Sequence, residues 1–479
     1  MTRPIIVWLR RDLRLADNRA IIRAASAGAP VIPLFILDDA TPGKWRAGGA
    51  GRWWLHHSLD SLDKDLHALG SRLVLARGKS IEVLPKLAAE CDAAAVFASR
   101  AYEPWAGELE YELRERLADS GTEFRRFAGT LLFEPEAVKT KDGGPFKVYT
   151  PFWRAATAAV EIPAPEPPPQ SLMAPREWPA SDQLASWSLL PEHPDWAAGM
   201  RESWTPGENG AKKRLSAFLS SSLASYGEDR NRPDREATSR LSPHLAFGEI
   251  SPATIWHAAA AALRRQPKRR AGYDVFCKEL VWREFSYHLL SHFPAFPEQP
   301  FRPEFTRFPW NDAPGLLRAW QRGKTGYPIV DAGMRELWHT GFMHNRVRMI
   351  VASFLVKDLA VPWQAGEAWF WNTLVDADLA NNAVSWQWVA GFGADAAPYF
   401  RVFNPVLQGA KFDPQGAYVR RWVPELARLP DDRIHKPWEA SPMELRAAGI
   451  DLGRTYPHPV VDHSEARDRA LAAFKALKG

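Results

Sequence analysis

The stretch of sequence that decides the fold class is residues 4–37, PIIVWLRRDLRLADNRAIIRAASAGAPVIPLFIL. Two short apolar runs rich in Val, Ile and Leu, Pro4–Leu9 and Val31–Leu37, predict β-strands. Between them, Asn18–Ala27 carries apolar residues at helical spacing. A strand, a helix and a second strand in this order are typical of a parallel sheet with helices packed on it. The stretch therefore predicts an α/β domain at the N-terminus.

The same alternation continues beyond residue 37. Further strands are predicted at Arg72–Leu75 and Ala94–Ala98, and further helices at Leu55–Leu69 and Ser80–Ala89. We expect a doubly wound, mostly parallel sheet within residues 1–132. Ligands of such sheets lie at the carboxyl ends of the strands, next to loops that here include Asp38–Asp39 and Arg100–Trp105.

A proline-rich segment follows this domain. Five prolines between residues 163 and 169 break any regular element, and we expect a stiff connector over residues 133–205. Beyond it helical patterns dominate, at Phe276–His292, Pro328–Thr340 and Asn345–Leu359. Ser251-Pro252 is a typical helix start, a capping residue followed by proline. We therefore expect an all-α domain over residues 206–479.

Composition limits the classes of protein that remain. The 479 residues carry a formal net charge of +5, so a surface for an anionic partner must be local. Cys91 and Cys277 lack CxxC spacing, which excludes a cysteine-ligated zinc or iron–sulfur site and fits a reducing compartment. Charges or prolines interrupt every apolar run. We expect a cytoplasmic protein with no signal peptide and no membrane span.

Two polar clusters are candidate ligand sites. Thr238-Ser239-Arg240-Leu241-Ser242 places three hydroxyls and a guanidinium before a helical stretch, where they suit a pyrophosphate, although hydroxyl-rich helix caps are common. Asp376-Ala377-Asp378 is followed by Asn381 and Asn382. A metal is possible there, but no histidine or third carboxylate is close in sequence, so a salt bridge to an arginine such as Arg348 is the simpler reading.

Residues 376–408, DADLANNAVSWQWVAGFGADAAPYFRVFNPVLQ, resemble the flavin-site signature of the photolyase/cryptochrome family. Residues 226–248, 278–285 and 341–359 resemble its other blocks in the same order, and residues 8–18, WLRRDLRLADN, resemble its N-terminal opening. The resemblance spans the chain. It implies an α/β antenna-chromophore domain over 1–132, a connector over 133–205 and a helical FAD-binding catalytic domain over 206–479.

FAD is the cofactor that this resemblance implies. The residues it assigns to FAD are Tyr226, Thr238, Ser239, Arg240, Leu241, Ser242, Phe276, Glu279, Arg283, Asn345, Arg348, Asp376, Ala377, Asp378 and Asn382. Phe276 stands where many relatives carry tryptophan, and Arg348 is expected to pair with Asp376. Asn382 is expected nearest the flavin N5. Plant cryptochromes typically place aspartate there, so Asn382 favours repair over signalling.

The activity implied is light-driven repair, in which electron transfer from reduced FAD splits cyclobutane pyrimidine dimers in UV-damaged DNA. The residues assigned to the substrate are Arg230, Glu279, Trp282, Asn345, Arg346, Met349, Trp388, Arg401 and Gln408. Glu279, Trp282 and Arg283 share one helix face at i, i+3 and i+4. Trp282 and Trp388 are expected to wall the dimer, and Glu279 to hydrogen-bond its base edges.

Catalytic roles are implied for Trp386, Trp363, Trp310, Asn382 and Glu279. The three tryptophans match the electron relay of the family. Trp320, Trp338, Trp369 and Trp371 have no such match and are assigned to the core, although a branch through Trp369 or Trp371 stays open.

The subclass and the antenna rest on finer details. The motif Met343-His344-Asn345-Arg346 resembles that of dimer photolyases rather than that of the (6-4) branch. The sequence around Trp386 resembles that of class III enzymes, although Leu379 stands where many of those carry proline. Class III resemblance implies methenyltetrahydrofolate as antenna, with Glu103 as the pterin-binding candidate; deazaflavin and FMN stay open. We expect a monomer. The alternative function is a cryptochrome-like photoreceptor, which the short C-terminal segment disfavours.

Overall fold

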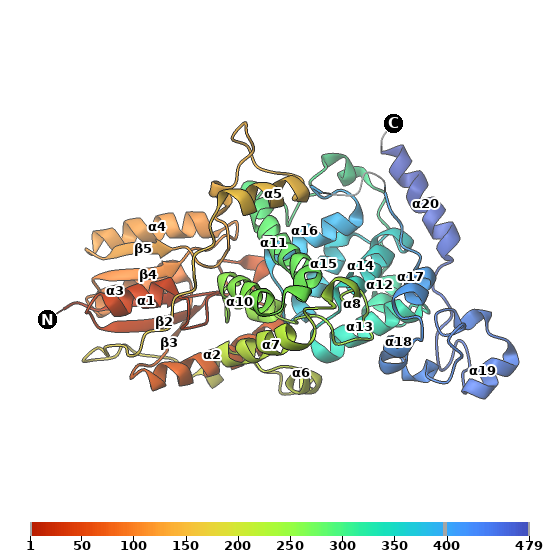
Figure 1. The fold of residues 1–479 in the computed structure, drawn as a ribbon, viewed down its shortest axis with the longest axis horizontal. Helices are drawn as coiled ribbons and strands as arrows, with labels where there is room; N and C mark the ends of the chain where they lie inside the picture. The colour runs from red at the N-terminus through yellow and green to blue at the C-terminus, as the bar shows by residue number, and fades with distance from the viewer. Residues whose placement is uncertain (1, 396–399, 478–479) are drawn as a thin grey trace.

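The structure is a computed structural model that describes residues 2–395 and 400–477. Residues 396–399, which belong to the signature stretch 376–408, therefore lie outside the described residues. The sheet with its helices occupies one end of the molecule and the helical domain the other, as Figure 1 shows. Within the described ranges, no helix is long and apolar enough to cross a membrane.

The N-terminal domain contains a five-stranded sheet in the order β3-β2-β1-β4-β5, with all neighbouring strands parallel. The strands are β1 (Ile5–Leu9), β2 (Val31–Leu37), β3 (Val74–Arg77), β4 (Ala95–Ser99) and β5 (Glu123–Phe127). The expected doubly wound α/β fold is confirmed. β5 escaped prediction because it is an edge strand of sequence EFRRF in which Phe124 alone is buried, so it lacks an apolar run.

Helices cover both faces of this sheet. They are α1 (Arg19–Ser26), α2 (Gly49–Ala68), α3 (Ser80–Glu90) and α4 (Ala106–Asp119). Alternate residues of β1 enter two separate cores: Ile5, Val7 and Leu9 pack in one, and Ile6 and Trp8 in the other. Burial on both faces is why the strands read as continuous apolar runs.

The connector is more ordered than its prolines suggest. It contains α5 (Tyr149–Ala159) and α6 (Ala198–Ser203). Its proline-rich part runs along the first domain, where the Leu172 N–H donates to the Leu69 carbonyl at 3.0 Å and the Asp182 N–H to the Leu75 carbonyl at 2.8 Å. Trp187 is buried in a sheet core. The connector therefore packs on the first domain and contributes to its core before the chain enters the helical domain.

The rest of the described chain is helical. Its helices are α7 (Glu208–Ser221), α8 (Tyr226–Asp229), α9 (Ser242–Ala246), α10 (Pro252–Arg265), α11 (Arg270–His292), α12 (Pro314–Gln321), α13 (Pro328–Thr340), α14 (Asn345–Ser353), α15 (Trp363–Thr373), α16 (Leu379–Ala390), α17 (Pro405–Phe412), α18 (Ala417–Trp422), α19 (Pro442–Ala448) and α20 (His463–Ala476). Ser251 caps α10 as predicted, accepting from the Thr254 N–H at 3.0 Å. The helix expected to end at Leu359 changes to π-helical geometry over Phe354–Asp358.

Buried polar contacts fasten the two domains together. Glu208 Oε2 of α7 accepts from the Leu15 N–H at 2.7 Å, and Arg14 Nη1 donates to the Gly248 carbonyl at 2.9 Å. A Cβ on Gly248 would lie 1.9 Å from the Arg11 carbonyl oxygen, so only glycine permits this approach. The domains therefore meet through a close, hydrogen-bonded interface.

Candidate active site

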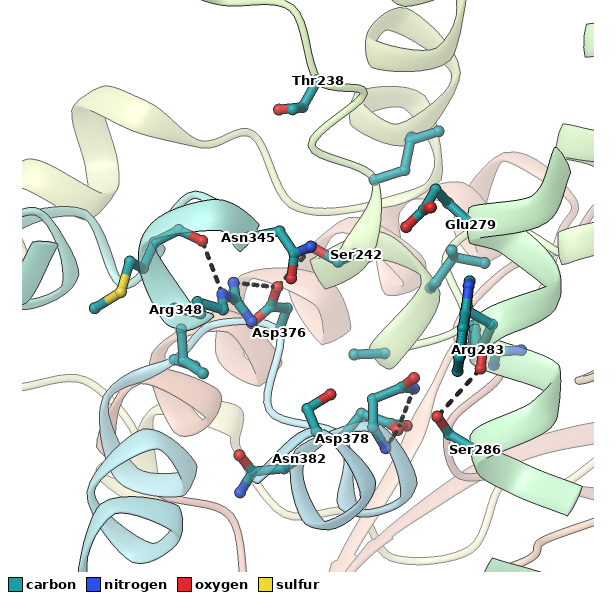
Figure 2. Close-up of a pocket in the computed structure, with 18 of the residues that line it drawn as sticks. Thr238, Ser242, Glu279, Arg283, Ser286, Asn345, Arg348, Asp376, Asp378 and Asn382 are labelled. Carbon is teal, nitrogen blue, oxygen red and sulfur yellow. Dashed lines mark hydrogen bonds and ion pairs between the residues drawn. The ribbon is translucent and has the colours of Figure 1, made fainter. Parts of the chain in front are cut away.

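A cavity of about 590 Å³ lies among the helices of the C-terminal domain. Side chains from α11 (Glu279, Arg283), from α14 (Arg348) and from the start of α16 (Asp378, Asn382) surround it (Figure 2). Every residue assigned to FAD from the sequence lines this cavity. Segments more than 100 residues apart in sequence, such as 238–242 and 376–382, therefore meet at one site.

An ion pair at the centre of this site holds Asp376 as expected. Asp376 Oδ2 accepts from Arg348 Nη2 at 2.8 Å and from the Ser242 hydroxyl at 2.6 Å. Asp376 Oδ1 is buried without a hydrogen-bond partner. In residues 2–395 and 400–477, no group of three or more His, Cys, Asp or Glu side chains is arranged to hold a metal. The acids at 376 and 378 thus form a hydrogen-bonded polar site.

Asp378 caps α16 rather than standing free. Its Oδ1 accepts from the Asn381 N–H at 2.9 Å, and its Oδ2 accepts from the Tyr287 hydroxyl. Asn382 of the same helix donates from its amide nitrogen to the Glu367 carbonyl at 3.1 Å, which leaves the amide oxygen for a ligand. These bonds fix both side chains before any ligand arrives.

The hydroxyl cluster lies where the chain enters α9. Arg240 has a left-handed backbone with φ of 51°, and its guanidinium packs over Trp204 and Phe342, 4.3 and 5.1 Å from the ring centroids. Its Nε is buried without a hydrogen-bond partner. Burial lowers the pKa of Arg240. A half-buried guanidinium with a buried, unpaired Nε, beside three hydroxyls, suits an anionic pyrophosphate.

Most of the residues assigned to DNA line the same cavity. Glu279 pairs with Arg230 at 2.6 Å, and Trp282 stacks on Tyr149 with ring centroids 3.7 Å apart and planes 7° apart. Asn345, Arg346, Met349 and Trp388 line the same cavity. Arg401 and Gln408 do not line it: Arg401 is exposed, and Gln408 lies half-buried on α17.

The three tryptophans predicted to form an electron relay differ in burial, from the core towards the surface. Trp386 lines the cavity and is buried, Trp363 is buried on α15, and Trp310 is half-buried. Trp386 packs against Gly366, one turn after Trp363; a Cβ on Gly366 would lie 2.1 Å from its ring. Trp320, assigned to the core, is fully buried with its ring centroid 6.3 Å from that of Trp386.

A second, smaller cavity of about 210 Å³ lies at the carboxyl ends of β1, β2 and β4, where the strand order predicts a ligand. Glu103, Tyr102 and Trp105 line it, and Arg11 Nε lies 3.3 Å from Glu103 Oε1. Ala377 lines both cavities. A single layer of protein thus separates the two sites at that point.

Two aromatic residues that contact side chains of the larger cavity were not predicted from the sequence: Tyr287 bonds to Asp378, and Tyr149 stacks on Trp282. Tyr287 lies one turn after Arg283 on α11, so helical spacing was enough to find it. Tyr149 comes from α5 of the connector, and its hydroxyl donates to the Lys278 carbonyl at 2.6 Å. No local signal marks Tyr149, because its role depends on a contact 133 residues away with Trp282.

Comparison with known proteins identifies the family. Residues 5–170 match the family model described as DNA photolyase, and residues 276–476 match that of the FAD binding domain of DNA photolyase. The deoxyribodipyrimidine photo-lyase of Agrobacterium fabrum is 53% identical, and the match covers 100% of this chain and 98% of that protein. The chain belongs to the photolyase/cryptochrome family. This confirms the resemblance, and the matched FAD-binding model confirms FAD as the cofactor.

Within the photolyase/cryptochrome family, photolyases and cryptochromes both match nearly the whole chain, and the Agrobacterium photo-lyase has the higher sequence identity. Cryptochrome-1 of Arabidopsis thaliana is 38% identical over 98% of this chain but 70% of its own length. The crystal structure of a bacterial class III photolyase from Agrobacterium tumefaciens superimposes with a TM-score of 0.95 and 52% identity, covering 100% of this chain and 98% of that one. A Synechocystis cryptochrome gives a TM-score of 0.88 at 29% identity, covering 99% of each chain.

Proposed function

We propose that this protein is a class III-like deoxyribodipyrimidine photo-lyase, which uses blue light to split cyclobutane pyrimidine dimers in DNA. The observation that carries the proposal is the full-length 53% identity with the Agrobacterium photo-lyase, together with the gathering of the expected site residues around one cavity. In this proposal residues 1–132 carry the antenna, 133–205 connect, and 206–479 bind FAD. We also propose that it acts as a monomer in the cytoplasm.

FAD, when bound, supplies light absorption and the transferable electron that opens the cyclobutane ring. The unpaired buried atoms Arg240 Nε and Asp376 Oδ1 fit a polar ligand of this kind. All five residues that we assign to FAD contacts here line the cavity. We assign Thr238, Ser239 and Ser242 to its phosphates, and Arg348 and Asn382 to the orientation of its ring, with the apolar walls of the cavity excluding water.

The damaged bases must leave the duplex to reach this cavity. Trp282 and Trp388 present apolar faces to them, while Arg346 and Arg230 supply positive charge for the backbone. Arg401 is exposed and lies outside the cavity, and we assign it to the DNA strand that flanks the dimer.

The direct test is repair. Purified protein with an oligonucleotide that contains one thymine dimer is illuminated with blue light, and the absorbance of intact thymine is followed. We expect light-dependent recovery. A cryptochrome-like photoreceptor would bind FAD but leave the dimer intact, so absence of recovery in reduced, flavin-loaded protein contradicts the proposal.

Trp282→Ala should weaken binding of dimer-containing DNA. Stacking of a base on an aromatic side chain contributes about 1–3 kcal/mol, which corresponds to a loss of affinity between roughly 5-fold and 150-fold. The measurement is the dissociation constant in the dark by fluorescence anisotropy. Trp338→Ala is the matched control, because Trp338 is 53% exposed and does not line the cavity. An equal loss of DNA affinity in both variants would show that Trp282 does not contact the dimer.

Trp386→Phe should slow light-driven reduction of the bound flavin. Phenylalanine is much harder to oxidise than tryptophan, so we expect the initial rate to fall about tenfold or more, equivalent to at least about 1.4 kcal/mol on the barrier. Visible absorbance under blue light with an external reductant measures this rate. Trp53→Phe, at an equally buried position in α2, should behave as wild type. An unchanged rate for Trp386→Phe would exclude it from the relay.

We further propose that the cavity at the strand ends takes the antenna, with methenyltetrahydrofolate as the preferred candidate. Glu103 supports this proposal, since its carboxylate lies beside Tyr102 and Trp105 and is partnered by Arg11. An absorption band of folate in protein freed of excess FAD would distinguish it from deazaflavin and FMN.

A further inference from the structure

Glu279 lies in the cavity with its carboxylate already paired. Its Oε2 accepts from Arg230 Nη2 at 2.6 Å, and the two side chains keep exposed fractions of 30% and 21%. Arg346 of α14 is the second cation whose charge acts on this carboxylate. The same two arginines are the groups that the proposed function assigns to the DNA backbone. Glu279 and the incoming phosphates therefore compete for the same cations.

The charge of Glu279 depends on these arginines. Burial raises the pKa of Glu279, whereas the charges of Arg230 and then Arg346 act to lower it. Two phenols also face it, from α8 and α5: burial raises the pKa of Tyr226 to about 12, and it raises the pKa of Tyr149 even further. Both phenols stay neutral near pH 7. Loss of the arginine charges would consequently raise the pKa of Glu279 further.

The two arginines are held in different ways. Arg346 donates from Nη2 to Asn231 Oδ1 at 2.6 Å, and its guanidinium lies over Phe412, 4.5 Å from the ring centroid. These partners are neutral, so a phosphate can pair with Arg346 without breaking an ion pair. Arg230 is bonded to the carboxylate itself. A phosphate that pairs with Arg230 must draw it from Glu279.

We propose that Arg230 exchanges partners when dimer-containing DNA binds, from Glu279 to a DNA phosphate, and that Glu279 takes up one proton from solvent in return. This inference rests on the proposed function. A carboxylic acid donates from its hydroxyl and accepts through its carbonyl, which complements the carbonyl oxygens and ring N–H of a pyrimidine edge. An ionised carboxylate would repel those oxygens and would oppose the arrival of an electron on the dimer. Arg230 is thus a positioning residue that sets the protonation of Glu279.

Proton uptake on binding is the test. Flavin-loaded protein is titrated in a calorimeter, in the dark, with a duplex that contains one thymine dimer. Repeating the titration in buffers of different ionisation enthalpy gives the number of protons taken up. Wild type should take up as much as about one proton, so that its affinity falls as pH rises. E279Q should take up none. R230Q should take up less than half as much as wild type, because loss of the Arg230 charge raises the pKa of Glu279 before DNA binds.

A matched control and a second readout separate this role from general electrostatics. R232Q removes an equal charge two residues from Arg230. Arg232 pairs with Asp234 at 2.6 Å, and the variant should keep the wild-type proton count. A carboxylic-acid C=O band should appear in infrared difference spectra on binding, and E279Q should lack it. Equal uptake by wild type and E279Q overturns the inference while dimer repair continues. Failure to bind or repair the dimer overturns the proposed function and the inference together.

Discussion

Asp376→Ala should lose its flavin. The substitution leaves Arg348 without its carboxylate in a site where Asp376 is buried, and it removes the acceptor of the Ser242 hydroxyl. Breaking a buried ion pair by removing one partner costs about 3–5 kcal/mol. Because Arg348, Ser242 and Asp376 come from three separate segments, their loss of contact should open the cavity. We expect purified variant with little bound flavin and a lowered midpoint of thermal unfolding.

The ratio of flavin to protein absorbance and a thermal unfolding curve measure these two effects. Asp312→Ala is the matched control, because it removes the same charge at an exposed position. It should retain flavin and unfold at the wild-type temperature. A flavin content for Asp376→Ala equal to that of the control would show that the ion pair does not organise the cavity.

Glu284→Ala should destabilise the contact between the domains. Glu284 is fully buried on α11, pairs with Arg283 at 2.8 Å, and accepts from the Leu132 N–H at 2.6 Å at the end of the first domain. Its removal leaves a buried guanidinium and a buried N–H unpaired, at a cost of about 3–5 kcal/mol. Denaturant unfolding measures this. Glu298→Ala is the control, since its interdomain pair with Lys44 is exposed and should cost no more than about 1 kcal/mol.

Glu284 should also make stability depend on pH. Burial raises its pKa in the folded protein to about 7, from 4.5 in the unfolded chain. The folded state therefore binds more protons between these values, and the free energy of unfolding falls as pH rises from 4.5 to 7, by about 3 kcal/mol. Glu284→Gln, which keeps the shape but does not titrate, should lack this part of the slope. If the free energy of unfolding depends on pH in the same way in wild type and in Glu284→Gln, the slope arises from other groups.

The sequence located most of the site for a definite physical reason. Glu279, Trp282 and Arg283 share a helix face that periodicity alone defines. Asp376, Asp378 and Asn382 were found as a dense polar cluster, and the family resemblance supplied their roles. Tyr149 was missed because it reaches Trp282 from the connector. Trp320 was assigned to the core, and its place beside Trp386 depends on the packing of separate helices.

The sequence by itself determined that an α/β domain is followed by a proline-rich connector and a helical domain, and it determined the residue types of the site. Those features follow from local periodicity, turn chemistry and composition. The pair of Arg348 with Asp376 was expected from the family resemblance, and the structure confirms it. The tertiary structure alone showed that Arg230 reaches Glu279, because separate helices pack together, and that Glu284 meets Leu132, because the domains dock. The strand–helix–strand stretch at residues 4–37 fixed the first domain, while long-range packing assembled the cavity in the second.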